Sequence, residues 1–286
     1  MVSHGCSIVT VTHNHAVIID RFIQSISDVR NVNIFVVDDH SSDTTADIVS
    51  NYAERMENLY FLEYRGPKSV APAVNFGLSE TDSEFVIIVQ PTVRITGDLI
   101  QQLLGALEKN PHLHGVIPGV SQKADTFRSY SKFPAHIDGL IAGFIFPEKW
   151  FSRLQLDTDS GKQGYLTNIS WCHSPVLCLR MESFKEVGYF DESFPEDLYQ
   201  LDWLLRLHKD SGEIAQIPGV HCEFISNDQN KFDLRHSITS HVGLFKYFEK
   251  HYDRVHHQFF NLIVGAVLYL LLPFKLLIRL VKIKIL

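Results

Sequence analysis

The sequence predicts an α/β fold with a mostly parallel central sheet flanked by helices. Short apolar runs typical of buried strands occupy 6–11, 32–38, 59–64 and 84–89 of the 286-residue chain. The stretches between them favour helices, and strands that alternate with helices form parallel sheets through right-handed crossovers. A composition of 45% apolar and 21% charged residues is typical of a globular protein and excludes a disordered or collagen-like chain.

Helical spacing is clearest in two stretches of the first half. Apolar residues recur every four positions in 18–26 and again in 99–107. Asn110-Pro111 is expected to end the second of these helices, because proline disfavours helical backbone in the residue before it.

The second half has a less regular pattern. Its expected elements are helices at 181–187, 197–209 and 236–252, and a short strand at 214–217 ended by Pro218-Gly219. Residues 119–170 carry few periodic runs and are interpreted as a long loop with at most one hairpin.

Cysteine content and charge exclude several classes of protein. The four cysteines contain no Cys-x-x-Cys pair, which argues against a disulfide scaffold and a structural zinc site. The net charge of −7 argues against a general nucleic-acid binder. Residues 1–15 lack the basic start of a signal peptide, so we expect the body of the protein to stay in the cytoplasm.

The last part of the chain differs from the body, 1–252. Within the tail, 253–286, the segment 259–274 is apolar with one exception, and 275–286 holds four basic residues and no acid. Sixteen helical residues reach ~24 Å, less than a ~30 Å hydrocarbon core. We therefore expect a helix that enters the membrane interface, turns near Pro273 and continues as an in-plane cationic helix. A true span and a soluble packed or oligomerising helix remain alternatives.

Polar side chains follow two of the predicted strands. Asp38-Asp39 ends the strand 32–38, and adjacent acids at a buried strand end cost stability without a ligand. The serines and Asp43 that follow are interpreted as caps of the next helix. Ligands bind beyond the carboxyl ends of strands in open parallel sheets, so this turn is a candidate site. The next such end, Gln90-Pro91-Thr92, lacks a metal-binding carboxylate.

Seven segments between residues 6 and 252 resemble, in family order, an inverting family 2 glycosyltransferase with a GT-A fold, and the last of them resembles its rhamnosyltransferase-like members. They are SIVTVTHN (7–14), VVDDHSSDTT (36–45), RGPKSVAPAVNFGL (65–78), SEFVIIVQPT (83–92), CLRMESFKEVGYFDESF (178–194), DWLLRLHKDSGEIAQIPGV (202–220) and FKYFEKHY (245–252). Each segment alone is a weak signal, and their order along the chain makes the resemblance specific.

The resemblance implies a nucleotide-diphosphate-sugar donor, a saccharide acceptor and Mg²⁺ or Mn²⁺. The implied nucleotide-binding residues are Thr12, His13, Asn14, Asp38, Asp39, Arg65, Asn75, Gln90 and Thr92. Trp171, His173 and Arg206 match acceptor-side positions, and His221 lies near the place of a metal-binding histidine. Core packing is the alternative for Trp171, and a polar strand end for His221. Lys68 is a further candidate phosphate contact, although no P-loop spacing is present.

The sequence departs from the family pattern at two positions. Thr92 stands at the family's metal-binding Asp, and Gln200 stands at its catalytic base. Glutamine cannot accept a proton at neutral pH. Glu196 and Asp197 are replacement candidates one turn earlier, with helix N-terminal charges as the alternative. Asp202 is a third candidate, with a structural hydrogen-bonding role as the alternative, because two residues along a helix turn a side chain by about 200°.

Two functions are consistent with these residues. The first is a glycosyltransferase at the cytoplasmic face of the membrane that acts on a lipid-linked saccharide in surface polysaccharide synthesis. The second is a catalytically degenerate relative that binds a sugar nucleotide or glycan, or scaffolds an active partner. The substituted positions Thr92 and Gln200 favour the second function, and the retained Asp38-Asp39 turn favours the first.

Overall fold

The structure is a computed structural model of the whole chain. It describes residues 5–122, 125–127, 130–131, 167–169, 171–172, 174–194 and 198–225, together with Gly243, Lys246, Tyr247, 249–251, Ala266 and Leu270. The fold and the site are described from these residues.

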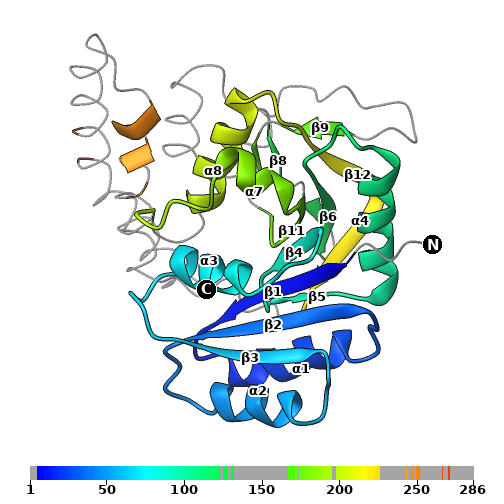
Figure 1. Cartoon of the computed structure of the whole chain (residues 1–286), viewed down its shortest axis with the longest axis vertical. Helices are drawn as coiled ribbons and strands as arrows, with labels where there is room; N and C mark the ends of the chain where they lie inside the picture. The colour runs from blue at the N-terminus through cyan, green and yellow to red at the C-terminus, as the bar shows by residue number, and fades with distance from the viewer. Residues whose placement is uncertain are drawn as a thin grey trace, which may run out of the picture.

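The first half of the chain forms a parallel sheet, as its sequence predicts. Its strands are β1 (Cys6–Thr12), β2 (Val32–Asp39), β3 (Leu59–Tyr64) and β4 (Phe85–Val89). They lie in the order β3-β2-β1-β4, and each pairs in parallel with its neighbour (Figure 1). Residues of β1, β2 and β4 are buried on both faces, which explains their continuous apolar runs.

Beyond β4 the neighbouring strands no longer all run in the same direction. β11 (Val176–Arg180) is antiparallel both to β4 and to β6 (Gly115–Gln122), and β12 (Ile214–Phe224) then runs parallel to β6. β5 (Val93–Arg94) closes this edge against β12. The sheet is therefore mixed, and the expectation of a mostly parallel sheet holds for its first half alone.

Short strands extend the far part of the sheet. β7 (Asp125–Phe127) forms a hairpin with β6, and β9 (Thr167–Ile169) pairs with β12. β8 (Tyr130–Ser131) and β10 (Trp171–Cys172) form a separate pair. Within the described part of 119–170, β6 and β7 form a hairpin, and β6 and β9 place parts of the segment in the main sheet.

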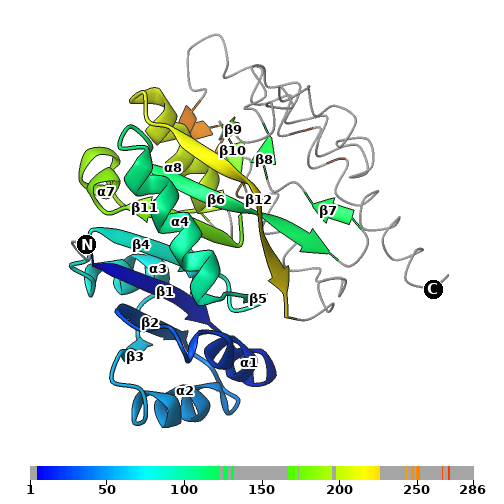
Figure 2. The same ribbon diagram turned by 90° about the vertical axis from the view of Figure 1, so that its right-hand side faces the viewer.

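The predicted end of a strand at Pro218 is wrong. β12 continues through Pro218-Gly219 to Phe224, and it lies along β6 for most of its length (Figure 2). Its pairing with β6 shifts register between Gln216 and His221, and Gly219 has φ +74°. Proline has no N–H for a strand ladder and glycine tolerates positive φ, so the two residues form an irregularity within one strand.

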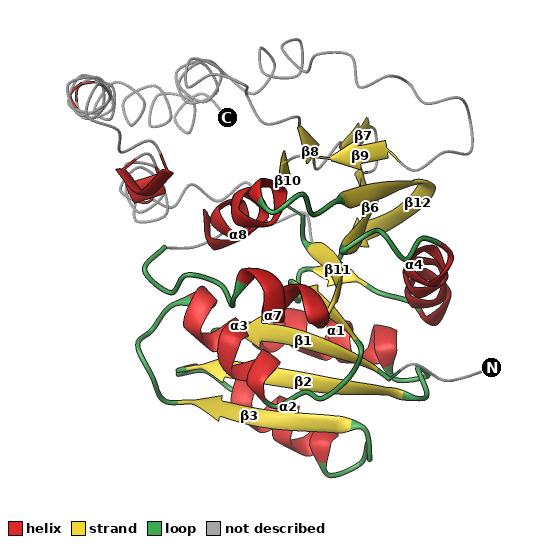
Figure 3. Ribbon diagram, turned by 45° about the horizontal axis from the view of Figure 1, so that its top comes forward, coloured by secondary structure: helices red, strands yellow, loops and turns green. Residues whose placement is uncertain are grey.

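Helices cover both faces of the sheet. α1 (Ala16–Ile26), α2 (Thr45–Ala53) and α4 (Gly97–Lys109) share one core cluster with Ile8, Ile34 and Ile87. α3 (Val70–Ser79), α7 (Glu182–Val187) and α8 (Leu198–Lys209) share the other cluster with Val9, Phe35 and Ile88. Figure 3 shows α4 and α8 on opposite sides of β6 and β11.

The expected helix at 236–252 is helical at the positions that are described, from Gly243 to His251, and the Tyr247 side chain is fully buried. Among the described residues, no helix combines the length and the apolarity needed to cross a membrane. Apart from Ala266 and Leu270, the tail from residue 253 lies outside the described residues.

Candidate active site

A pocket lies where β1, β2 and β4 end. These strands are adjacent and parallel, so their carboxyl ends lie at one edge of the sheet. The cavity has a volume of about 190 Å³. Its walls are formed by Val11, Thr12, His13, His15, Asp39, Val70, Val74, Ile88, Val89, Gln90, Pro91, Thr92, Pro175, Tyr199 and Gln200. The edge predicted from the sequence to bind a ligand is therefore hollow.

Two helices that cover one face of the sheet, α3 and α8, complete the pocket walls. α3 contributes Val70 and Val74, and the first turn of α8 contributes Tyr199 and Gln200. The Gln200 Oε1 accepts a hydrogen bond from the Ser174 backbone at 3.4 Å, and its amide group lies 3.4 Å from the Tyr199 hydroxyl. These long contacts leave the amide of Gln200 available to a ligand in the pocket.

The adjacent acids at the end of β2 point to opposite faces, as successive residues of a strand do. Asp39 lines the pocket, with its Oδ1 2.9 Å from His40 Nδ1. Asp38 does not line it: the Asp38 Oδ2 accepts a hydrogen bond from the Ser41 backbone at 2.9 Å, and its buried Oδ1 has no partner among the described residues. The structure therefore brings one acid of the pair to the pocket and uses the other in the turn.

The turn after β1 places two histidines in the pocket wall. His13 Nδ1 lies 2.7 Å from the Asp39 carbonyl oxygen, which can only accept, so this nitrogen carries the proton. His15 has the opposite arrangement, because its Nδ1 accepts from the His13 backbone N–H at 3.5 Å. Burial, and then the neighbouring His13, lower the pKa of His15 below its ordinary value, while Asp43 acts in the other direction. Thr12 also lines the pocket, and its hydroxyl lies 3.3 Å from His15 Nδ1.

Asn14 has a structural part in the same turn and does not line the pocket. Its backbone has φ +53°, a conformation that asparagine tolerates better than most residues. Its Oδ1 accepts a hydrogen bond from the Ser42 backbone at 2.7 Å. Asp43 accepts one from the backbone of Thr45, the first residue of α2, at 3.0 Å, although the N-cap position of this helix is Thr44 and not Asp43 or a serine as expected. These contacts hold the β1 and β2 turns together beside the pocket.

The end of β4 supplies the opposite wall. Gln90 and Thr92 both line the pocket, and the Gln90 backbone donates to the Pro175 carbonyl at 2.9 Å. The Thr92 hydroxyl is buried and has no hydrogen-bond partner among the described residues. A buried hydroxyl without a partner costs free energy, so a ligand that bonds to it would gain affinity.

Two predicted nucleotide contacts lie outside the pocket. Arg65 pairs with Glu63 at 2.9 Å, and its side chain is 85% exposed. Asn75 donates to the carbonyl of Phe190 at 2.9 Å and accepts from the backbone N–H of the same residue at 3.2 Å. Phe190 packs edge-on against Tyr199, with ring centroids 4.8 Å apart. Asn75 therefore fixes the chain segment that supports the Tyr199 side of the pocket.

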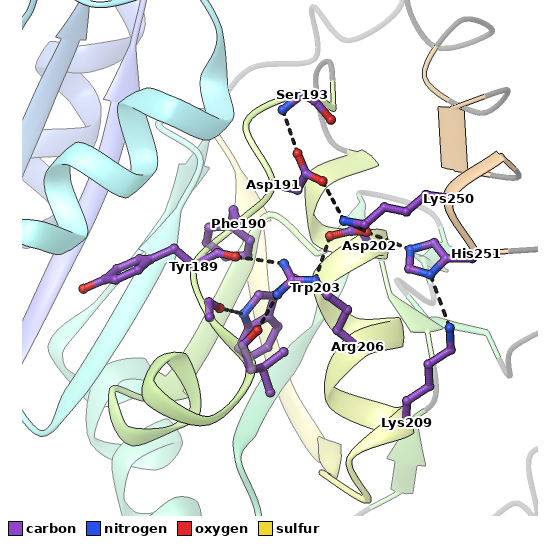
Figure 4. Close-up of polar contacts among 12 residues, drawn as sticks. Tyr189, Phe190, Asp191, Ser193, Asp202, Trp203, Arg206, Lys209, Lys250 and His251 are labelled. Atoms are coloured by element: carbon purple, nitrogen blue, oxygen red, sulfur yellow. Dashed lines mark hydrogen bonds and ion pairs between the residues drawn. The ribbon is translucent and has the colours of Figure 1, made fainter. Parts of the chain in front are cut away.

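Asp202 and Arg206 lie on another face of α8 and do not line the pocket (Figure 4). The fully buried Asp202 carboxylate is bonded by Arg206 Nε at 2.9 Å, Lys250 Nζ at 2.8 Å and His251 Nε2 at 2.7 Å. The remaining guanidinium nitrogens of Arg206 donate to the carbonyls of Val187 and Tyr189. As a result, neither residue has a group free to act on a substrate.

The fold stabilises the ionised form of Asp202. Burial raises the pKa of Asp202, but hydrogen bonds from His251 and Lys250 outweigh it and hold the pKa below its ordinary value. Asp191, which Lys250 also bonds, shows the same balance: burial raises its pKa, and bonds from Lys250 and Ser193 lower it to about 2. Asp202 is therefore ionised and paired at neutral pH, and its lowered pKa makes it a poor acceptor for the proton of a substrate hydroxyl.

The described residues of the pocket do not form a ligand set for a divalent cation. Of its described lining residues Asp39 is the sole carboxylate, and His40 already bonds its Oδ1. Thr92 stands where a carboxylate ligand is expected, and a neutral hydroxyl is a poor substitute. His221 is exposed on β12 beside Gly119 and does not reach the pocket wall. In the part of the chain that the structure describes, no three His, Cys, Asp or Glu side chains gather in a metal-binding group.

Some predicted site residues cannot be placed. Glu196, Asp197 and His173 lie outside the described residues, and of Trp171 the strand pairing alone is described. Conversely, His15 and Tyr199 line the pocket but are not among the site residues predicted from the sequence. A signal for His15 was its position two residues after His13 in a strand-to-helix turn. The signal for Tyr199 was its place beside Gln200 in the altered motif.

Comparison with known proteins identifies the family. The family model described as Glycosyl transferase family 2 matches residues 7–188, more than half of the chain. The chain belongs to glycosyl transferase family 2. The match includes all the strand ends that form the pocket. Among curated proteins, no sequence matches the chain.

Solved glycosyltransferases share the fold of this family 2 member. The mannosyltransferase PcManGT from Pyrobaculum calidifontis, in complex with GDP-Man and Mn²⁺, matches with TM-score 0.59 and 17% identity over 97% of this chain and 73% of its own. S. aureus TarS 1-349 matches with TM-score 0.57 and 15% identity over 93% and 80%. Glucosyl-3-phosphoglycerate synthase from Mycobacterium tuberculosis, with Mn²⁺ and UDP, matches with TM-score 0.59 and 15% identity over 86% and 79%. At these identities the likeness establishes a GT-A-like α/β fold.

Proposed function

We propose that the protein transfers a sugar, with inversion, from a nucleotide-diphosphate-sugar donor to a lipid-linked saccharide at the cytoplasmic face of the membrane. The observation that carries the proposal is the pocket at the ends of β1, β2 and β4, with Asp39 in one wall and the unpaired Thr92 hydroxyl in the other. Solved relatives in fold bind GDP-Man or UDP-GlcNAc, which supports a sugar nucleotide as the donor.

The proposed reaction is a single displacement. The acceptor hydroxyl oxygen forms a bond to the anomeric carbon, and the bond from that carbon to the diphosphate oxygen breaks. The electron pair of the broken bond leaves with the nucleoside diphosphate, and the hydroxyl proton passes to a carboxylate base. We propose Glu196 or Asp197 as this base, because they directly precede α8, whose residues Tyr199 and Gln200 line the pocket.

The acceptor side is proposed from fewer residues. Trp171 and His173 remain candidates for contact with the acceptor sugar. Arg206 is withdrawn from this role, because its guanidinium bonds Asp202 and two backbone carbonyls. The acceptor itself is proposed to be lipid-linked because the apolar and basic tail would hold the pocket near a membrane and raise the effective concentration of such a substrate.

Turnover with a panel of sugar nucleotides tests the proposal. UDP-, GDP- and dTDP-sugars are incubated with the full chain and a lipid-linked saccharide fraction, and release of nucleoside diphosphate is measured. We expect acceptor-dependent release with at least one donor. Either Glu196→Gln or Asp197→Asn should lower kcat by about 10²-fold or more without weakening donor binding. Unchanged rates in both variants would remove these two residues as the base.

Flotation with vesicles tests the proposed role of the tail. The full chain is expected to float with vesicles of phosphatidylcholine and phosphatidylglycerol, and a chain that ends at residue 258 is expected to remain in the soluble fraction. A truncated chain that still floats would show that the body binds the membrane by itself.

A binding protein without turnover is the second candidate. The neutral residues Thr92 and Gln200, at positions where the family carries acids, favour it. This function predicts that a sugar nucleotide binds to the chain but that no donor is consumed with any acceptor fraction. Consumption of a donor that stops in the Asp39→Asn variant would contradict it.

A further inference from the structure

A lysine ammonium group lies next to the part of the pocket wall that His13 and Asp39 form. Lys68 Nζ lies 2.9 Å from Nε2 of His13, and His13 lines the pocket. The other ring nitrogen of His13 lies 2.7 Å from the Asp39 carbonyl oxygen. A chain of hydrogen bonds thus runs from the end of β2, through the imidazole, to an ammonium group in the loop before α3.

The chemistry of these atoms fixes the direction of each bond. The Asp39 carbonyl can only accept, so His13 Nδ1 is the protonated nitrogen and donates to it. An ammonium group can only donate, so Lys68 donates to the lone pair of His13 Nε2. In this arrangement His13 donates through Nδ1 and accepts through Nε2, and the Lys68 ammonium group is held next to the pocket wall.

A diphosphate leaving group requires such a charge. When the bond from the anomeric carbon to the diphosphate breaks, its electron pair stays on the diphosphate, which gains one negative charge, while the acceptor proton goes to the base. A cation held beside this group stabilises the developing charge. A divalent cation has no adequate ligand set here, because Thr92 is neutral and the Asp39 Oδ1 is bonded by His40.

We propose that Lys68, positioned by His13, binds and neutralises the diphosphate of the donor, so that this protein uses its sugar nucleotide without a divalent metal. The inference rests on the proposed function, since it assumes that the pocket binds a nucleotide sugar. Lys68 is exposed and follows Gly66-Pro67, so its ammonium group can move from His13 to a phosphate oxygen when the donor binds. Lys68 lies two residues before α3, and the positive end of the α3 dipole favours an anion in the same place.

The other cation of this loop is not equivalent. Arg65 already pairs with the carboxylate of Glu63 at 2.9 Å, whereas Lys68 contacts His13, a residue of the pocket wall. Lys68 has a ring nitrogen of His13 as its partner, and a phosphate that replaces this nitrogen adds the pairing of opposite charges. Arg65 would have to break an ion pair to reach the sugar nucleotide, whereas Lys68 would only leave a ring nitrogen, so the free-energy cost is lower for Lys68.

Calorimetric titration of the full chain tests the inference. UDP, GDP and dTDP, with their nucleosides and monophosphates, are titrated in the presence of EDTA and again with Mn²⁺. We expect at least one diphosphate to bind in EDTA, with a Kd that Mn²⁺ changes by less than about twofold. Lys68→Ala should weaken this diphosphate by about tenfold or more, the effect of one charged hydrogen bond, and its nucleoside by less than about twofold.

Matched variants distinguish the effect of the positive charge of Lys68 from the effect of its placement by His13. Lys68→Arg should retain most of the affinity for the diphosphate. His13→Asn keeps a donor for the Asp39 carbonyl but loses Nε2, and should weaken the diphosphate more than the nucleoside. Lys185→Ala, which removes an exposed lysine from α7, serves as the control and should change neither.

The outcomes distinguish this inference from the proposed function. A diphosphate that binds with Mn²⁺ and not in EDTA would overturn the inference and leave the proposed function in place. Equal affinities of the wild-type chain and Lys68→Ala would also overturn it. If no nucleotide binds to the wild-type chain under either condition, the proposed function fails, and the inference fails with it.

Discussion

Two faces of α8 illustrate how a site differs from a structural cluster. Gln200 and Asp202 lie two positions apart in the helix, and both are buried, with exposed fractions of 2% and 0%. Gln200 lines the pocket and makes two contacts of 3.4 Å. Asp202 is bonded by the side chains of Arg206, Lys250 and His251 at 2.7 to 2.9 Å. The buried polar group that faces the ligand pocket has weak partners, while the group that holds the fold is fully bonded.

This difference follows from the geometry of the helix. Two residues turn a side chain by about 200° around the axis, so Gln200 and Asp202 cannot face the same space. The comparison also explains why an acid in a catalytic-looking motif has a structural role here. Variants at each face should therefore affect different properties, and they are considered below from the largest expected effect to the smallest.

The largest effect is expected from Asp202→Asn. The substitution leaves Lys250, Arg206 and His251 without their buried carboxylate, and loss of one partner of a buried ion pair costs about 3 kcal/mol or more. Urea denaturation measures the change in the free energy of unfolding. Asp210→Asn, an exposed site just after the same helix, is the control. Equal stabilities of the two variants would contradict the structural role of Asp202.

The next effect concerns ligand affinity at the end of β2. Asp39→Asn should weaken the best-binding nucleotide by about tenfold, because a charged acceptor in the pocket wall is lost. Asp38→Asn should change the affinity less, because its carboxylate bonds the backbone of Ser41. Calorimetric titration of both variants measures the contrast. A larger loss for Asp38→Asn would reverse our assignment of the two acids.

A pH effect is expected at the Asp202 cluster. The pKa of Asp191 falls from the model-peptide value of 3.8 to about 2 in the fold. The unfolded chain therefore binds more protons in this range, and the stability that Asp191 contributes is present above about pH 4 and is lost as the pH falls toward 2. Denaturation at a series of pH values should show a shallower acid loss for Asp191→Asn than for the wild-type chain. Parallel curves would contradict the lowered pKa.

The smallest effect is expected from Arg65→Ala. Its ion pair with Glu63 joins side chains that are 85% and 57% exposed, and such pairs contribute less than about 1 kcal/mol. Stability and nucleotide affinity should both stay close to those of the wild-type chain. An affinity loss as large as that of Lys68→Ala would show that Arg65, too, binds the diphosphate.

The sequence was sufficient for the parts of the fold that depend on local pattern. The strands β1 to β4 and a hollow at the edge that contains Asp39 were predicted because buried parallel strands and their polar ends are local features. The passage of β12 through Pro218-Gly219 was not predicted, because the register shift that accommodates these residues depends on β6.

Side-chain partners from distant segments were also beyond prediction. The role of Asp202 depends on Lys250 and His251, about 50 residues later in the chain. The role of Asn75 depends on the backbone of Phe190. Residue type and motif position cannot reveal such pairings. A structural role was one of the two expectations for Asp202, whereas Asn75 was expected to contact the nucleotide.

The most direct measurement is a crystal structure of the full chain soaked with the sugar nucleotide that binds best. Our account predicts the nucleotide in the pocket between Asp39 and Thr92, with the diphosphate beside Lys68 and His13. A nucleotide bound elsewhere on the surface, with this pocket still empty at saturating ligand, would contradict the account.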